Sequence, residues 1–229
     1  MKYYNHHTWN DRWIAEQVFP KKEAGFFVEV GAGDGINGST TYFLEKNLNW
    51  NGILVEPYPL WVANMPSVRP KSSVVDCCAS SQNGHVDYFE FTTRGMEGFS
   101  FAPELSPNHQ HWLDVNHRYD KGGFYSMRNQ YIELDHVKSA YSIIKKRTLT
   151  LQKILEDNNA PSVIDYLSID IEGAEYSLLK DFPFDKFTFK AISIERDMCR
   201  DILLNNGYRE SSNPFSESDC EFYFLAKEN

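Results

Sequence analysis

The chain has 229 residues, a formal net charge of −9, and a composition that is 41% hydrophobic and 15% aromatic. This composition predicts one folded domain, residues 1–229, and excludes a disordered chain. The acidic balance argues against broad binding to nucleic acid. No apolar stretch is long enough to span a membrane, and the N-terminus lacks the apolar run of a signal peptide. The cysteines form no C-x-x-C pair, so we expect a cytoplasmic protein with reduced cysteines.

The first predicted element is a short amphipathic helix over residues 8–19. Trp9, Trp13, Ile14 and Val18 share one side of it. Pro20 then ends the helix. We expect residues 1–22 to form a helical cap on the edge of the domain.

A buried strand, residues 26–30, carries Glu29 and leads into a turn of mostly small residues: Gly31, Ala32, Gly33, Asp34 and Gly35. Ser39 is an N-cap candidate for the helix that follows. In open α/β sheets, a nucleotide-like ligand binds at such a strand–turn–helix crossing, against backbone N–H groups. The alternative is that the glycines only make the turn.

The second strand, residues 52–56, ends at Glu56 and is closed by Pro57. An acid at this place accepts hydrogen bonds from ribose hydroxyls in nucleotide-binding α/β domains. A third strand over residues 73–78 places Asp76 and the backbone near Cys77 where an adenine amino group would lie. Residues 86–91 alternate in polarity and predict a strand at a solvent-exposed edge.

Residues 93–146 show weak periodicity and are rich in aromatic, His, Asn and Arg residues. A stretch of this length inside a compact domain is typically a functional insert. We expect an acceptor-side insert or lid, whose aromatic and polar groups suit a sugar or another hydroxylated acceptor. A crossover without substrate contact is the alternative.

Regular patterning returns at residues 147–155, a strand end followed by a helix that Thr150 caps. A strand beginning at residue 164 runs into a turn with three acids, Asp170, Glu172 and Glu175. Another strand, residues 189–195, is followed closely by Asp197. Two closing strands are expected at residues 208–211 and 221–226.

Four segments together cover most of the chain: VEVGAGDGINGSTT (28–41), LVEPYP (54–59), RTLTLQKIL (147–155) and YLSIDIEGAEYSLLKDF (166–182). In this order they resemble the FkbM family of S-adenosylmethionine-dependent O-methyltransferases, and the last segment is the most specific. Residues 93–146 match poorly, which leaves the acceptor open. The resemblance implies an α/β, Rossmann-like class I methyltransferase fold: a seven-stranded, mostly parallel sheet with an antiparallel last strand and helices on both faces.

The resemblance also implies a binding site for S-adenosylmethionine. Its predicted contacts are Glu29, Gly31, Ala32, Gly33, Asp34, Ser39, Glu56, Pro57, Asp76, Cys77 and Asp170. The glycine turn would hold the methionine part, with Asp34 suited to a cationic sulfonium, and Asp170 would lie beside the methyl group.

Transfer to a hydroxyl needs a base or a Lewis acid for the departing proton. Asp170 and Glu172 are the candidate bases. Alternatively, Asp170, Glu195 and Asp197 would hold Mg²⁺. Glu172 and Glu175 have a structural alternative, because acids near a helix start stabilise it through the helix dipole.

The predicted function is therefore methyl transfer from S-adenosylmethionine to a hydroxyl of a sugar, in a glycan or glycosylated product. The alternatives are a non-sugar small-molecule acceptor and a non-catalytic cofactor-binding module. A dinucleotide-dependent oxidoreductase is disfavoured, because Ile36 stands where G-x-G-x-x-G requires its third glycine.

Overall fold

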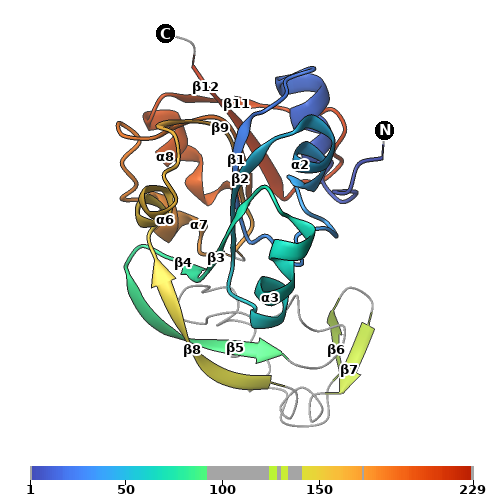
Figure 1. The fold of residues 1–229 in the computed structure, drawn as a ribbon, viewed down its shortest axis with the longest axis vertical. Helices are drawn as coiled ribbons and strands as arrows, with labels where there is room; N and C mark the ends of the chain where they lie inside the picture. The colour runs from blue at the N-terminus through green and yellow to red at the C-terminus, as the bar shows by residue number, and fades with distance from the viewer. Residues whose placement is uncertain (1, 92–123, 128–129, 134–140, 172, 228–229) are drawn as a thin grey trace.

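The fold is built on a seven-stranded sheet, seen in a computed structural model that describes residues 2–91, 124–127, 130–133, 141–171 and 173–227 (Figure 1). The strand order is β11-β12-β10-β9-β1-β2-β3. The strands are β1 (Phe26–Val30), β2 (Asn51–Glu56), β3 (Ser73–Asp76), β9 (Val163–Ile169), β10 (Thr188–Glu195), β11 (Tyr208–Ser211) and β12 (Glu221–Ala226). β12 runs antiparallel to both of its neighbours, β10 and β11, and the other neighbouring pairs of this sheet are parallel. The predicted fold class is confirmed.

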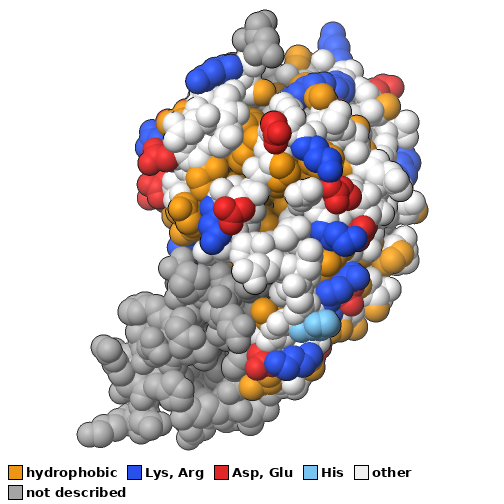
Figure 2. All heavy atoms as spheres, turned by 90° about the vertical axis from the view of Figure 1, so that its left-hand side faces the viewer, with side chains coloured by type: hydrophobic (Ala, Val, Ile, Leu, Met, Phe, Trp, Pro, Cys, Tyr) orange, Lys and Arg blue, Asp and Glu red, His pale blue; other side chains and the backbone are white. Residues whose placement is uncertain are grey.

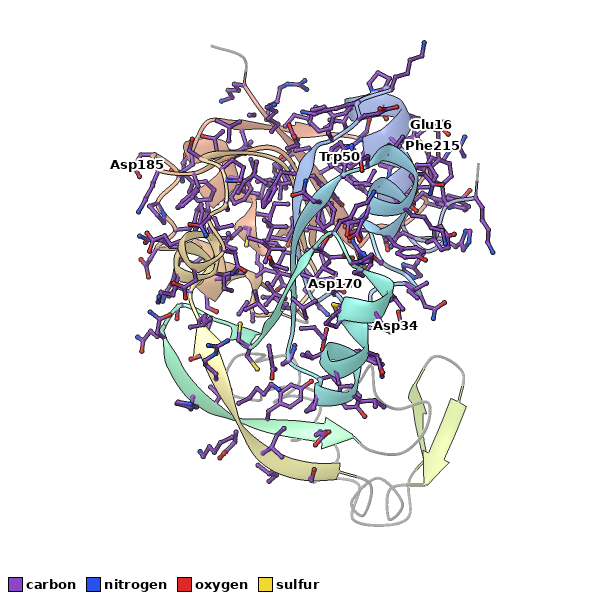
Figure 3. All side chains as sticks on the ribbon, in the orientation of Figure 1. Glu16, Asp34, Trp50, Asp170, Asp185 and Phe215 are labelled. Atoms are coloured by element: carbon purple, nitrogen blue, oxygen red, sulfur yellow. The ribbon has the colours of Figure 1, made fainter. Side chains whose placement is uncertain are left out.

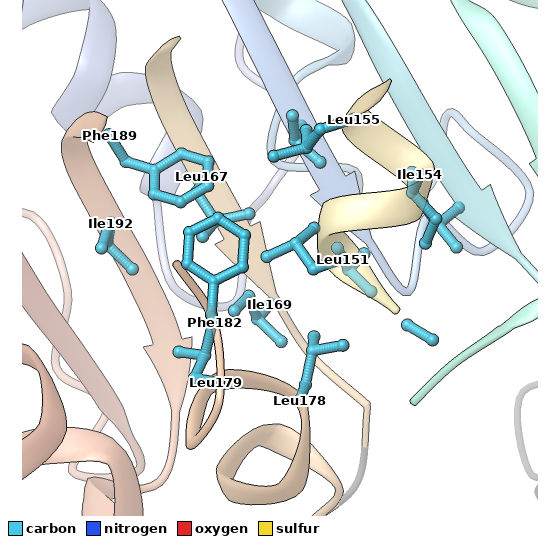
Figure 4. Close-up of a cluster of buried hydrophobic side chains, with 14 of the residues drawn as sticks. Leu151, Ile154, Leu155, Leu167, Ile169, Leu178, Leu179, Phe182, Phe189 and Ile192 are labelled. Atoms are coloured by element: carbon cyan, nitrogen blue, oxygen red, sulfur yellow. The ribbon is translucent and has the colours of Figure 1, made fainter. Parts of the chain in front are cut away.

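Helices cover both faces of this sheet. Successive side chains of a strand point to opposite faces, and the central strands carry apolar residues on both. In β1, Val28 packs in one buried cluster and Phe27 in the other. The Val28 cluster includes side chains of α6 (Leu151–Asp157), α7 (Glu175–Leu179) and α8 (Arg200–Asn205). The Phe27 cluster includes side chains of α2 (Tyr42–Leu48), α3 (Pro59–Val68) and η1 (Trp13–Val18). Figure 4 shows the first cluster, with leucines of α6 and α7 beside residues of β9 and β10.

The N-terminal segment forms α1 (Asn10–Arg12) and η1, inside the predicted range 8–19. Trp13 is fully buried. Its ring lies 6.5 Å from that of Tyr166 in β9 and 4.8 Å from that of Tyr223 in β12. The segment is therefore held on the sheet face by aromatic packing.

A second sheet joins β4 (Cys78–Ala79), β8 (Tyr141–Leu149) and β5 (Gly84–Phe91). The predicted third strand is therefore split, because the Cys77 N–H turns back to the Val75 carbonyl (3.1 Å) and the residues beyond it pair with β8. Strand β5, predicted as an edge strand, lies at the edge of this sheet and pairs along its length with β8. Within the predicted insert, residues 93–146, β6 (Phe124–Met127) pairs with β7 (Gln130–Glu133). Residues 92–123, 128–129 and 134–140 lie outside the described residues.

One smaller expectation, the cap of α6, is confirmed. The Thr150 hydroxyl accepts a hydrogen bond from the Lys153 N–H (3.1 Å), so Thr150 caps α6 as predicted. The face with α6 and α8 carries acids and bases interspersed with apolar side chains (Figure 2). Within the described ranges, none of the helices has the length and apolarity needed to cross a membrane.

Candidate functional site

The glycine turn, Glu56 and Asp170 meet at the carboxyl ends of neighbouring strands of the sheet. Strands β1, β2 and β9 are parallel neighbours, so their carboxyl ends lie together. The N–H groups of Gly31 and Ala32 donate to the Val55 carbonyl of β2 at 3.0 and 3.1 Å. Figure 3 labels Asp34 and Asp170 near the middle of the view. Ligands of open α/β sheets bind at this edge.

The turn after β1 depends on glycine at its first position. Gly31 has a φ of 88°, and a Cβ built on it would stand 1.9 Å from the main-chain oxygen of Asp170. Any side chain there would therefore push β9 away from the turn. At Gly33, by contrast, a Cβ would meet nothing closer than the Trp61 ring at 4.0 Å. The turn is thus closely packed where it leaves the sheet and open at its outer side.

Glu56 is a buried carboxylate at the end of β2, only 5% exposed. It accepts hydrogen bonds from the N–H groups of Gly33 in the glycine turn (2.9 Å) and of Tyr58 directly after Pro57 (2.8 Å). Burial raises its pKa to about 7, against the opposing effect of these two donors. A carboxylate has further lone pairs for additional donors, so Glu56 has the capacity to bind hydroxyl groups.

The carboxylate of Glu29 is bonded within the chain. One oxygen accepts from the Thr40 N–H (2.7 Å) and hydroxyl (3.1 Å), and the other accepts from the hydroxyls of Ser39 (2.9 Å) and Thr41 (2.5 Å). Four donors on a buried carboxylate offset the cost of its desolvation. Glu29 and Ser39, both predicted as cofactor contacts, are thus bonded to one another.

Asp34 caps its own turn. One carboxylate oxygen accepts from the N–H groups of Ile36 (2.8 Å) and Asn37 (2.7 Å), and the other from the Asn37 side-chain amide (2.6 Å). Such contacts from an aspartate to the backbone two or three residues on stabilise a turn. The negative charge of Asp34 remains beside the glycines.

Asp76 and Cys77, at the end of β3, are placed differently from one another. The Asp76 side chain is half-exposed and forms an ion pair with Lys146 of β8. The Cys77 side chain lies in the core, and burial raises the pKa of its thiol to about 12. Only the backbone of Cys77 therefore suits the predicted contact with an adenine.

The acids after β9 divide into an exposed one and a buried one. Asp170 is exposed, and its N–H donates to the Val30 carbonyl (2.9 Å). Glu175 is fully buried, and one of its oxygens accepts from the N–H groups of Ile171 and Gly173, both at 3.1 Å. Glu175 therefore holds the turn between β9 and α7. Glu172, the second predicted base, lies outside the described residues.

The predicted metal ligands do not come together. Asp170, Glu195 and Asp197 are all described, yet no three His, Cys, Asp or Glu side chains in the described residues are grouped so that they could hold a metal ion. Glu195 instead lies 3.5 Å from Arg196 and opposite Glu221 in the sheet. The prediction of an Mg²⁺ site at these residues has no support here.

Sequence reasoning missed two basic residues, Arg69 and Lys146. Arg69 follows α3 and is completely buried, with contacts to the glycine turn. Lys146 is buried beside Asp76. No motif marks either position: Arg69 directly follows α3 and Lys146 lies inside β8, and sequence spacing gives no sign of their partners.

One family of known proteins matches most of the chain. The family model described as the methyltransferase FkbM domain matches residues 29–209, a range that includes the glycine turn, Glu56 and Asp170. The search of curated proteins found no match.

Two solved structures share a distant likeness with the chain. One is a precorrin-6y C5,15-methyltransferase from Geobacter metallireducens, with 11% identity, a TM-score of 0.37, and coverage of 89% of this chain and 80% of that one. The other is a Methanococcus jannaschii fibrillarin pre-rRNA processing protein, with 11% identity, a TM-score of 0.41, and coverage of 96% and 74%. Likeness at this level says nothing about substrate or mechanism.

Proposed function

The chain belongs to the FkbM methyltransferase family, as its motifs predict, and from this premise we propose that it transfers the methyl group of S-adenosylmethionine to a hydroxyl oxygen of a sugar. Family membership supports a methyltransferase and implies the use of S-adenosylmethionine. That the methyl group goes to a hydroxyl oxygen, and that the acceptor is a sugar, are our proposals beyond family membership.

One observation carries the proposal: three features that suit S-adenosylmethionine lie at one edge of the sheet. Glu56 would accept hydrogen bonds from the ribose hydroxyls, for which its buried carboxylate has free lone pairs. The backbone of residues 31–33 would lie along the methionine part, where the outer side of Gly33 is open. Asp76 and the backbone at Cys77 would flank the adenine.

Asp170 is the proposed base. Its main chain touches Gly31, so its exposed side chain begins beside the turn that would hold the methionine part. S-adenosylmethionine, when bound, supplies an electrophilic methyl group on a sulfonium. With it bound, a lone pair of the acceptor oxygen would form the new bond to the methyl carbon as the carbon–sulfur bond breaks with its electron pair going to sulfur, and Asp170 would accept the hydroxyl proton. Glu172 is retained as the alternative base.

The acceptor is proposed to enter on the side of residues 93–146. The composition of this insert, with its many aromatic and hydrogen-bonding residues, suits a sugar. Strand β8 leads out of the insert. The ion pair between Lys146 and Asp76 links β8 to the carboxyl end of β3, beside the proposed adenine site. The insert therefore joins the domain next to the proposed site. We also propose that residues 1–229 act as one domain, with residues 1–22 as its cap.

The experiment is a binding and transfer assay on the whole chain. We expect calorimetry to show binding of S-adenosylmethionine and S-adenosylhomocysteine but not NAD. With S-adenosylmethionine carrying a labelled methyl group, mass spectrometry should find one added methyl on a sugar from a panel of glycans and non-sugar alcohols. Transfer to a non-sugar alcohol alone would reject the sugar, and binding without any transfer would favour a non-catalytic module.

A further inference from the structure

Arg69 is a cation fully enclosed by the fold. It follows the last residue of α3, and none of its surface is exposed. A buried guanidinium is costly unless it is paired and hydrogen-bonded. The hydrogen-bond partners of Arg69 therefore identify the segments that its guanidinium fixes.

The guanidinium joins two parts of the fold. Its Nε donates to Glu45 of α2 at 2.9 Å. Its Nη1 donates to the Gly35 carbonyl (3.0 Å) and the Ser39 hydroxyl (3.2 Å), and its Nη2 donates to the Thr41 hydroxyl (2.8 Å). Three of the four acceptors belong to residues 31–41, which we name the cofactor loop. Arg69 thus fixes this loop to α2 and α3.

The same contacts complete the environment of Glu29. Arg69 Nη1 lies 3.7 Å from the Glu29 carboxylate. The Thr41 hydroxyl accepts from Arg69 and donates to Glu29. The carboxylates of Glu29 and Glu45 therefore share one buried cation, and the far end of the loop is held by both a positive and a negative group.

We infer that Arg69 is a positioning residue, which holds the cofactor loop in the conformation that binds S-adenosylmethionine. The inference rests on the proposed function, because the loop is the proposed seat of the methionine part. Arg69 acts through Gly35, Ser39 and Thr41 and does not itself reach the ligand. A preorganised loop binds more tightly because it loses less conformational freedom on binding.

The chemistry of arginine is needed at this place. A guanidinium presents five N–H donors in a planar fork, whereas a lysine ammonium presents three from one point. Lysine would keep the charge between Glu29 and Glu45 but would not reach the loop and α2 together. Arg69→Lys is therefore the informative variant, since it removes the geometry and leaves the cation.

A second variant guards against misfolding of Arg69→Lys. Thr41→Val removes the hydroxyl that links Arg69 to Glu29 at nearly constant side-chain volume. Thr41→Ser keeps this hydroxyl and is the matched control. Thr41→Val removes only the two hydrogen bonds of this hydroxyl and leaves the other contacts of Arg69 in place, so the fold should persist.

Two measurements separate positioning from general stability. In hydrogen–deuterium exchange of the ligand-free chain, Arg69→Lys and Thr41→Val should speed exchange in residues 31–41 and leave β1, β2 and β9 protected. Calorimetry with S-adenosylhomocysteine should show binding weaker by about tenfold or more in both variants, because each loses at least one buried hydrogen bond that holds the loop. Thr41→Ser should match the unmodified chain in both.

Unchanged loop exchange in the folded variants would overturn the inference. Exchange that rises as much in the strands as in the loop would also overturn it, because Arg69 would then serve general stability. If the unmodified chain fails to bind S-adenosylhomocysteine, the proposed function fails, and the exchange comparison still decides whether Arg69 holds the loop.

Discussion

The main-chain oxygen of Asp170 occupies the space where a side chain on Gly31 would stand, 1.9 Å from the position of its Cβ. The contact joins the turn after β1 to the end of β9. A second link runs beside it, from the Asp170 N–H to the Val30 carbonyl at 2.9 Å. The proposed base and the proposed methionine-binding turn are therefore fixed to one another through the backbone.

Gly31→Ala should be much more destabilising than its conformation alone explains. Gly207 is the matched control, because it has the same φ of 88° and a Cβ there would meet nothing within 4 Å. For Gly207→Ala we expect a loss of about 1–2 kcal/mol in the free energy of unfolding, the cost of a left-handed conformation. Gly31→Ala should lose clearly more free energy of unfolding than Gly207→Ala, and it should no longer bind S-adenosylhomocysteine. Urea denaturation measures the first effect, and equal losses in the two variants would contradict the close contact.

Asp170→Asn should slow methyl transfer without weakening cofactor binding. Loss of a general base typically lowers kcat by about 10²–10⁴-fold, while the backbone contacts of residue 170 stay in place. Asp181→Asn is the control, because that side chain is an acid with 80% exposure. Single-turnover rates and calorimetry with S-adenosylhomocysteine give the two readouts. Full transfer activity in Asp170→Asn would remove Asp170 from the chemistry and leave Glu172 as the candidate.

The framework of the site could be predicted from the sequence because it follows from strand patterning. A buried strand before Gly31, an acid at the end of β2 and another after β9 place Glu56 and Asp170 at the same edge of a parallel sheet. The split of the third strand at Cys77 could not be predicted, since residues 73–78 read as one continuous strand. Pairing of Cys78 with Thr148 of β8 decides the break, and it joins residues far apart in the chain.

Side-chain partners were harder to predict than positions. Glu29 and Asp34 stand where a cofactor contact is expected, yet both carboxylates bond to the loop itself. Sequence spacing gives the place of an acid but not which donors reach it. The partners of Arg69 were harder still to predict, because the Ser39 hydroxyl to which it donates lies 30 positions earlier in the chain.

Glu175 should tolerate an amide but not truncation. One carboxylate oxygen accepts from the N–H groups of Ile171 and Gly173, and the other has no hydrogen-bond partner among the described residues. Glu175→Gln keeps an acceptor for these donors, whereas Glu175→Ala leaves two buried N–H groups unpaired. We expect Glu175→Ala to lose about 1–3 kcal/mol of stability.

The pH dependence gives Glu175 a second test. Burial raises the pKa of Glu175, so between its unfolded and folded pKa values the folded chain holds more protons than the unfolded chain. The stability of the unmodified chain should therefore fall as pH rises through this window. Glu175→Gln lacks this slope and should gain stability relative to the unmodified chain as pH rises. Urea denaturation across pH would refute the assignment if Glu175→Gln were as unstable as Glu175→Ala.

Binding of S-adenosylhomocysteine should depend on the ionisation of Glu56. Burial raises the pKa of Glu56 from 4.5 to about 7 in the ligand-free chain. Ribose hydroxyls donate hydrogen bonds, which favour the ionised carboxylate and lower its pKa in the complex. Binding therefore releases a proton at low pH, and affinity should rise with pH and level off above about 7. Between about pH 6 and pH 8 we expect roughly a tenfold gain in affinity.

Glu56→Gln isolates this effect. It keeps one acceptor for the Gly33 or Tyr58 N–H but cannot ionise, so its affinity should be lower and independent of pH over the same range. In the ligand-free chain the same shift acts in the opposite direction: the folded state holds the proton to higher pH than the unfolded state, so stability falls as pH rises from about 4.5 to about 7 and Glu56→Gln removes this slope. Calorimetry in two buffers of different ionisation enthalpy counts the released proton directly. A flat affinity profile in the unmodified chain, or the same slope in Glu56→Gln, would exclude Glu56 from the ribose site.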